Sequence, residues 1–224
     1  MERLLVLGAA PLAYGSFVGL CVRIGPRRLA PLLRHRRTYN IALAAYSLAA
    51  AIQGGAILAA DGRLADPYKL ACTPSASWPW FWLTSKFVEF ADTAFIVARA
   101  RLPTRLHALH HALTPSMVLL DVYVAASPSP LFLVATVLNL VTHAAMYTFY
   151  SDPPRFAAFK SAVTRVQIGQ HATVFALLVG TLGFANRDDC DVPVVRYKIA
   201  LVFYAWMLSA FMRLYVLQEK NKVL

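Results

Sequence analysis

Ionisable and polar side chains recur at helical spacing inside apolar stretches of this sequence. Lys86, Glu89, Asp92 and Thr93 follow one another at intervals of three and four residues. Residues three and four apart lie on the same face of a helix, so a helix would place this set in one stripe. A charge inside a membrane span costs about 3 kcal/mol unless it is paired or hydrated, and such residues are usually functional. A buried ion pair between Lys86 and Glu89 is the alternative interpretation.

Histidines follow in the next apolar stretch, again at helical spacing. His107, His110 and His111 occupy positions i, i+3 and i+4, and a neutral imidazole in a dry pocket can act as a nucleophile or a proton carrier. Two further polar stripes lie downstream, namely Asn139, His143, Met146, Tyr147 and Tyr150, and then Thr164, Gln167, Gln170 and His171. A single histidine on an apolar face is more often a packing residue, and the tyrosines would also fit a membrane-interface belt.

The composition places these polar stripes in a membrane protein. Hydrophobic residues make up 58% of the 224 residues, charged residues make up 15%, and the mean hydropathy is +0.53. This leaves too little polar surface to coat a soluble globule of that size. The net charge of +11 would also fit a nucleic-acid-binding protein, but the basic residues lie between the apolar runs. We therefore expect no nucleic acid as a partner.

The apolar runs predict the fold class. Runs of about 20 residues, the length that a bilayer core requires, fall near 4–22, 39–60, 77–98, 106–126, 131–150, 161–185 and 194–217. Pro and Gly occur at the joints, and no linker is long enough to separate domains. The sequence therefore predicts an all-α integral membrane protein with seven transmembrane helices, which forms one domain over residues 1–224.

Arginines and lysines concentrate in the connections on one side of these seven spans. The positive-inside rule places that side in the cytosol, with the carboxyl terminus cytosolic and the amino terminus lumenal. The four polar stripes then meet in the cytosolic half of the membrane, where we predict one site. Near the carboxyl end, Lys220 and Lys222 fit a retrieval signal for the endoplasmic reticulum.

Three cysteines, at positions 21, 72 and 190, have no CxxC spacing, so neither a zinc site nor a dithiol redox motif is predicted. The predicted topology puts Cys72 and Cys190 in two connections on the lumenal side, where the compartment is oxidising. We expect them to form a disulfide. Two free lumenal thiols are the alternative.

In these stretches the sequence resembles the ELO family of very-long-chain fatty-acid elongases. The family motifs KxxExxDT, HxxHH, HxxMYxYY and TxxQxxQ appear here in the same order, starting at Lys86, His107, His143 and Thr164. Each motif alone would be weak, whereas four in register are specific. The sequence departs from the family at Phe149, which replaces a tyrosine, and at His171, where an aromatic residue often stands. Both departures bear on substrate preference.

The resemblance implies that the chain condenses a long-chain acyl-CoA with malonyl-CoA to give a 3-oxoacyl-CoA, carbon dioxide and CoA. It also implies that the last six helices form a barrel around an acyl tunnel. We expect no cofactor and no metal beyond the two CoA substrates. The endoplasmic reticulum bilayer, a second copy of the chain and other elongation-cycle enzymes are candidate partners. By position, the far end of the tunnel would lie near Gly180, Leu182, Gly183 and Phe184.

The reaction needs an acyl acceptor and donors for the oxyanions. The predicted topology keeps all three cysteines away from the site, so histidine is the candidate nucleophile. We expect His110 to carry the acyl group, with His111 and His143 as proton acceptor and oxyanion donor. His107 and Asn139 complete the predicted catalytic set, and the remaining motif residues would bind substrate. The arginines that would bind the CoA phosphates are Arg99, Arg101 and Arg105.

Three other classes of protein share part of the pattern. A di-iron membrane desaturase or hydroxylase also has an HxxHH box, but such sites draw on about eight histidines and this chain has six. A lipid transporter would share the hydrophobic spans. A retinal-type receptor would need a lysine in the middle of the last span, whereas Lys198 lies near its start.

Overall fold

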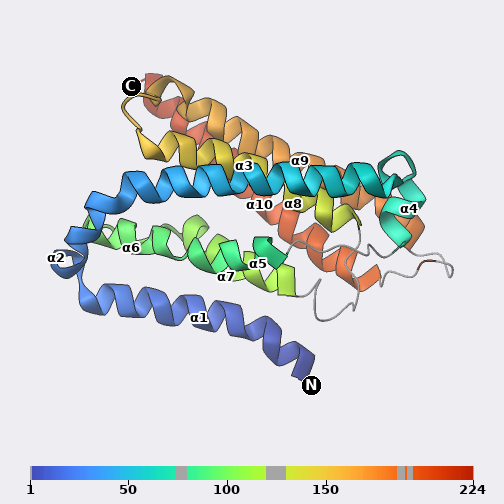
Figure 1. Ribbon diagram of the computed structural model, residues 1–224, viewed down its shortest axis with the longest axis horizontal. Helices are drawn as coiled ribbons and strands as arrows, with labels where there is room; N and C mark the ends of the chain where they lie inside the picture. The colour runs from blue at the N-terminus through green and yellow to red at the C-terminus, as the bar shows by residue number, and fades with distance from the viewer. Residues whose placement is uncertain (1, 74–79, 120–129, 186–189, 191–193, 224) are drawn as a thin grey trace. The chain divides into compact units, whose positions relative to one another are not determined.

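The computed structural model describes residues 2–73, 80–119, 130–185, 190 and 194–223, and within these ranges the chain contains helices and no strands (Figure 1). The α-helices and 3₁₀ helices are, in order, α1 (Glu2–Ile24), α2 (Pro26–Leu29), η1 (Ala30–His35), α3 (Arg36–Asp61), η2 (Arg63–Ala65), α4 (Pro67–Cys72), α5 (Trp80–Val88), α6 (Ala91–Ala98), α7 (Arg105–Leu119), α8 (Pro130–Ser151), η4 (Ala157–Phe159), α9 (Lys160–Ala185) and α10 (Val194–Val223). The all-α fold class is as predicted.

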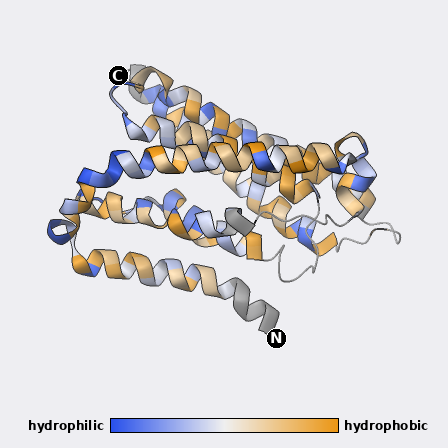
Figure 2. Cartoon of the chain, in the orientation of Figure 1, coloured by the Kyte–Doolittle hydropathy of each residue, from blue (hydrophilic) through white to orange (hydrophobic). Residues whose placement is uncertain are grey.

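Four helical stretches in the described part of the chain are long and apolar enough to cross a membrane. They are Pro26–Asp61, Pro130–Ser151, Ala157–Phe184 and Val194–Lys220, and a shorter apolar helix covers Gly8–Ile24. The hydropathy colouring shows hydrophobic residues along much of the length of these helices (Figure 2). A helix satisfies all of its backbone hydrogen bonds internally, as a lipid environment requires. The chain therefore has the features of a multi-pass membrane protein.

The predicted third and fourth spans differ from this pattern. The prediction of one unbroken helix through 77–98 is wrong, because α5 ends at Val88 and α6 begins at Ala91. At the break, the backbone N–H groups of Phe90, Asp92 and Thr93 each donate to the carbonyl three residues earlier, as in a 3₁₀ turn. The fourth helix, α7, is described only as far as Leu119. Seven spans and a barrel stay predictions.

The helices fall into two compact units, which are described separately. Unit 1 contains residues 1–39 and 79–126, where α1 packs along α7 and α6. Its core includes Cys21, Leu29 and Val97. Gly25 connects α1 to α2 with a φ of 81°, a conformation that costs a residue with a Cβ about 1–2 kcal/mol, and Pro26 then begins α2. This turn returns the chain toward α6.

Unit 2 contains residues 40–78 and 127–224, with α9 packed against both α8 and α10. The backbone of α3 approaches α8 at Gly54, where an added Cβ would lie 2.7 Å from the Val137 side chain. Only glycine permits that approach without a shift in the packing. The side-chain amide of Asn40 also donates to the Tyr150 carbonyl at 3.2 Å. These contacts hold α3 along the polar stripe-bearing helix α8.

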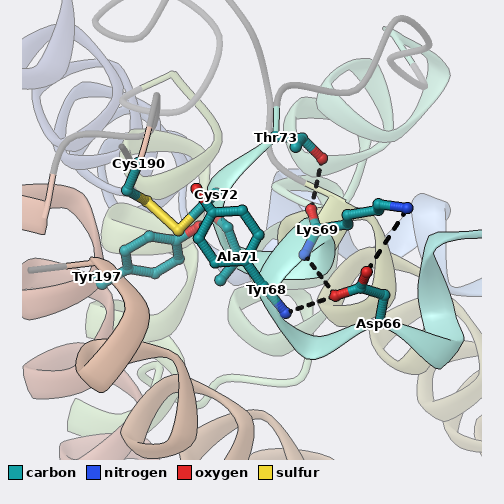
Figure 3. The surroundings of a disulfide bond; sticks show 8 residues. All are labelled: Asp66, Tyr68, Lys69, Ala71, Cys72, Thr73, Cys190 and Tyr197. Carbon is teal, nitrogen blue, oxygen red and sulfur yellow. Dashed lines mark hydrogen bonds and ion pairs between the residues drawn. A yellow bond between two sulfur atoms is a disulfide. The ribbon is translucent and has the colours of Figure 1, made fainter. Parts of the chain in front are cut away.

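A disulfide joins two connections of unit 2. Cys72 at the end of α4 is bonded to Cys190, with a Cα–Cα distance of 4.6 Å, so the predicted pairing is confirmed (Figure 3). The Tyr197 hydroxyl donates to the Ala71 carbonyl beside it. At the other end of α4, the Asp66 carboxylate caps the helix, and the backbone N–H of Lys69 is the main group that lowers the pKa of this carboxyl. The capped helix and the disulfide fix this end of the unit.

Candidate active site

Lys86 and Glu89 form a buried ion pair in unit 1. Lys86 Nζ donates to Glu89 Oε1 at 2.8 Å, and the two residues are only 1% and 3% exposed. Ser85 Oγ donates to the same carboxylate oxygen at 3.4 Å. An ion pair in a dry environment must be closely matched, because its desolvation cancels much of the attraction. The paired carboxylate therefore restrains the Lys86 ammonium at the break between α5 and α6.

A hydrogen-bonded chain of three side chains joins the first two motifs. The Thr93 hydroxyl lies 2.9 Å from the hydroxyl of Tyr14 and 3.0 Å from Nε2 of His107. Thr93 ends the lysine motif on α6, and His107 begins the histidine motif on α7. Sequence reasoning missed Tyr14, because α1 carries no motif and a single tyrosine in an apolar helix gives no periodic signal. These two hydrogen bonds fix the orientation of the His107 ring.

The three histidines of α7 share one face, as their spacing predicts. The ring centroids of His107 and His111 are 4.2 Å apart, and those of His110 and His111 are 5.4 Å apart. The Tyr14 ring stacks on His111 at 5.8 Å. His111 is thus enclosed by two rings, while His107 is held through Thr93. Unit 1 therefore presents a packed imidazole cluster.

Unit 2 carries the third and fourth motifs on neighbouring helices. Asn139, His143 and Tyr147 are buried along α8, and the rings of His143 and Tyr147 are 5.6 Å apart. Gln167 of α9 donates to the sulfur of Met146 on α8 at 3.7 Å. The structure therefore brings these two motifs together within one unit.

The ends of these two motifs have structural contacts. Thr164 of α9 donates to the Gln218 side chain of α10 at 3.1 Å, a partner that the motif could not reveal. Tyr150 is 44% exposed at the end of α8, and its ring packs on Phe149 at 5.3 Å. The substrate-binding roles predicted for Thr164 and Tyr150 stay predictions.

Phe149, where the family has a tyrosine, lines an apolar groove of about 700 Å³ between α3, α8, η4 and α9. The hydroxyls of Thr148 and Ser151, which also line it, donate back to carbonyls of their own helix at 2.7 Å. The phenyl ring of Phe149 therefore fits the apolar lining of this groove. Phe149 lies off the stripe formed by His143, Met146 and Tyr147.

His171, the second position at which the sequence departs from the family pattern, is also buried in unit 2. It is 3% exposed on α9, directly after Gln170. Its ring stacks on Phe211 at 5.1 Å and lies 5.7 Å from Tyr204, both on α10. His143 is also buried, on α8, which packs against α9. Unit 2 thus holds two buried imidazoles on neighbouring helices.

Three arginines of unit 1 gather beyond the end of α6. Burial and the charges of Arg36 and Arg101 lower the pKa of Arg99. Ala100, between Arg99 and Arg101, has a φ of 56°, which a non-glycine residue adopts at a cost. Like charges held together favour a polyanionic ligand, since each phosphate would relieve their repulsion. Arg105, the third predicted CoA ligand, is exposed at the first position of α7.

The far end of the acyl tunnel near Gly180, Leu182, Gly183 and Phe184 stays a prediction, and helix geometry adds one candidate residue to it. Gly180 and Gly183 are exposed, with no atom within 4 Å of an added Cβ. At 3.6 residues per turn, Gly183 lies about 160° around α9 from Gln167. Thr181 lies about 20° from Gln170 by the same geometry, and it is buried, with its hydroxyl donating to the Leu178 carbonyl. Thr181 therefore lies on the same face of α9 as Gln170 and is a candidate to line the far end of the acyl tunnel.

Among the described residues, no group of three or more His, Cys, Asp or Glu side chains is arranged to hold a metal ion. The expectation of a metal-free site stays a prediction.

The ELO family, described as GNS1/SUR4, matches residues 9–222 of the chain. The chain belongs to this family. The match includes Tyr14 of α1 and Gln218 of α10, so the similarity to the family extends beyond the four motifs. It assigns this protein to the fatty acid elongases, and neither the desaturase nor the transporter interpretation is supported.

Several curated relatives of this ELO protein are named elongases. The "Long chain fatty acid elongase 1" of Caenorhabditis elegans is 30% identical over 198 residues, which cover 80% of this chain and 67% of the relative. The "Very long chain fatty acid elongase 6" of Drosophila melanogaster is 25% identical over 194 residues, covering 79% of this chain and 60% of the relative. The human "Very long chain fatty acid elongase 3" is 32% identical over 118 residues, which cover 50% of this chain and 41% of the relative. No solved structure matches the chain.

Proposed function

We propose that this ELO protein condenses a long-chain acyl-CoA with malonyl-CoA through an acyl-histidine intermediate. The observation that carries the mechanism is the state of the three cysteines. Cys72 and Cys190 are bonded to each other, and Cys21 is buried among apolar side chains of unit 1. No thiolate is then available as the acyl acceptor, whereas imidazole forms an acyl derivative that a carbon nucleophile can attack.

The contacts of the α7 histidines favour His110 as the acyl carrier. The ring nitrogen Nε2 of His107 is bound to Thr93, and His111 is enclosed between Tyr14 and His107. His107 then acts as a positioning residue, and His111 is adjacent to accept a proton. His143 and Asn139 of α8 are the candidate oxyanion donors, and Gln167 and Gln170 orient them.

The proposed reaction has two steps. A ring nitrogen of His110 attacks the thioester carbonyl of the acyl-CoA, the C–S bond breaks, and the thiolate leaves and takes a proton to become free CoA. Malonyl-CoA then loses carbon dioxide, and the electron pair of the broken C–C bond passes into an enolate. The enolate carbon attacks the acyl carbon, and the C–N bond breaks to release the 3-oxoacyl-CoA. The leaving imidazolate takes a proton from water through His111, which restores the neutral His110.

The remaining substrate contacts follow from charge and position. Arg99, Arg101 and Arg105 would bind the CoA phosphates, and the acyl chain would extend in a tunnel past Thr181. Binding the two CoA esters in turn avoids a contest between two polyanions for the same arginines. A membrane of the endoplasmic reticulum, with the amino terminus lumenal and the carboxyl terminus cytosolic, belongs to this proposal.

The test uses the full chain in membranes with malonyl-CoA labelled at C2 and a panel of acyl-CoAs. We expect the label in 3-oxoacyl-CoA products, with one carbon dioxide released for each product. His110→Ala should abolish the product, whereas His35→Ala, which removes an exposed imidazole, should leave it unchanged. Labelled product at the wild-type rate from His110→Ala would refute the assignment of the acyl carrier. No product from any acyl-CoA would refute the reaction.

A further inference from the structure

One buried imidazole has no part in the reaction described above. Nδ1 of His171 is buried and has no hydrogen-bond partner among the described residues. An unpaired buried polar atom is destabilising, because it has lost its hydrogen bonds to water, and such atoms in folded proteins call for an explanation. The ring cannot turn freely, because Phe211 and Tyr204 pack on it. Nδ1 is therefore a fixed polar atom that a bound ligand could satisfy.

The side chains around His171 define the chemistry of that ligand. Gln170, His143 and Asn139 are all buried on the polar stripes of α8 and α9 in the same unit. We call Asn139, His143, Gln170 and His171 the donor cluster, because each can donate an N–H. The described carboxylates of unit 2 lie at helix ends instead: Asp61, Asp66, Asp152 and Glu219. A set of donors without an acid is suited to an oxygen that gains negative charge.

We propose that His171 is a catalytic residue that donates a hydrogen bond from Nδ1 to the thioester carbonyl oxygen of malonyl-CoA as this oxygen becomes an enolate. The inference rests on the proposed function. When the C–C bond to the carboxylate breaks, carbon dioxide leaves without the electron pair. That pair enters the enolate, and the charge appears on the oxygen that His171 holds. The proton stays on Nδ1, and the charge moves on when the enolate carbon attacks the acyl group.

The choice of the carbonyl over the carboxylate follows from transition-state stabilisation. A donor on the carboxylate would stabilise the charge that has to disappear, and decarboxylation would become slower. A donor on the carbonyl oxygen stabilises the charge that develops and so lowers the barrier. The stacking of His171 on Phe211 fixes the donor before the reaction, so little reorganisation is needed.

Three variants separate a catalytic donor from a packing residue. His171→Phe keeps an aromatic ring against Phe211 and removes the N–H, so kcat for carbon dioxide release should fall about 100-fold or more. The KM for acyl-CoA and the release of CoA from acyl-CoA alone should not change. In His171→Asn the amide nitrogen replaces Nδ1 at a similar distance from the backbone, so kcat should stay within about tenfold of the wild type. His35→Phe is the control for removing an imidazole elsewhere.

The outcomes distinguish this inference from the proposed function. A wild-type kcat in His171→Phe would overturn the role of His171, while a wild-type protein that never releases carbon dioxide from malonyl-CoA would refute the function itself. If His171→Phe fails to fold, His171→Ala is compared with the wild type by infrared spectroscopy. The probe is a non-decarboxylating malonyl-CoA analogue with a ¹³C thioester carbonyl. We expect a lower carbonyl frequency in the wild type, and equal frequencies would overturn the inference.

Discussion

Tyr14 offers an informative single substitution, because its hydroxyl joins α1 to the hydrogen-bonded chain that runs through Thr93 to His107. Tyr14→Phe removes the oxygen that lies 2.9 Å from Thr93 Oγ1. It keeps the ring, which packs at 5.0 Å from Phe90 and 5.8 Å from His111. The fold of unit 1 should therefore survive. The Thr93 hydroxyl, however, keeps only His107 of its two hydrogen-bond partners and is held less firmly in place.

The expected size of the effect follows from one hydrogen bond. A neutral hydrogen bond contributes about 0.5–1.5 kcal/mol. If that energy serves to hold His107 in its reactive orientation, kcat/KM should fall about two- to twelvefold. The KM for malonyl-CoA should change little, because Tyr14 contacts the histidine cluster and not the arginines. The effect should appear in the acyl-transfer step.

The assay is the initial rate of labelled 3-oxoacyl-CoA formation over a range of acyl-CoA concentrations. Tyr39→Phe is the matched control, because it also removes one tyrosine hydroxyl from the same unit, where this hydroxyl donates to the backbone carbonyl of Val88 at 3.3 Å. A Tyr14→Phe rate equal to the wild type, or an equal loss in both variants, would refute the reasoning that the hydroxyl chain positions His107.

Three further predictions concern stability and product length. Cys72→Ser opens a disulfide that closes a loop of 118 residues, and should destabilise the oxidised protein by about 4.9 kcal/mol in the chain-entropy model; an unchanged melting temperature without reductant would contradict this. Glu89→Gln leaves the buried Lys86 without its counter-charge and should cost about 3–5 kcal/mol. Adding Lys86→Met should recover most of that loss, and a double variant no more stable than the single one would show that the pair is not the cause. Thr181→Phe should shorten the longest product, whereas Gly183→Phe should not, and identical product profiles would place the tunnel elsewhere.

Residue spacing correctly predicted which side chains share a face where all of them lie on one helix. The i, i+4 spacing of His107 and His111 predicted a shared face, and their rings lie 4.2 Å apart. The pairing of Cys72 with Cys190 followed from two connections on one side of the membrane, which a count of apolar runs can give. Both predictions rest on local periodicity or on topology, and neither requires knowledge of side-chain packing.

Contacts between helices could not be predicted in the same way. Tyr14 and Gln218 lie outside the motifs, and their partners, Thr93 and Thr164, are 79 and 54 residues away. The break after Val88 was missed because the apolar pattern continues through it without Pro or Gly. What interrupts the helix is a change to i−3 hydrogen bonds at the motif, and periodicity of side chains does not report that change.

The acyl-histidine intermediate is tested most directly by a single-turnover measurement on the purified full chain. The protein is mixed with a long-chain acyl-CoA in the absence of malonyl-CoA, and free CoA and the mass of the protein are followed together. We predict about one CoA released per active site, at a rate no slower than steady-state turnover, with the acyl mass on the peptide that contains His110. His110→Ala should show neither change. An active preparation that gives no early CoA and no added mass would contradict the covalent mechanism.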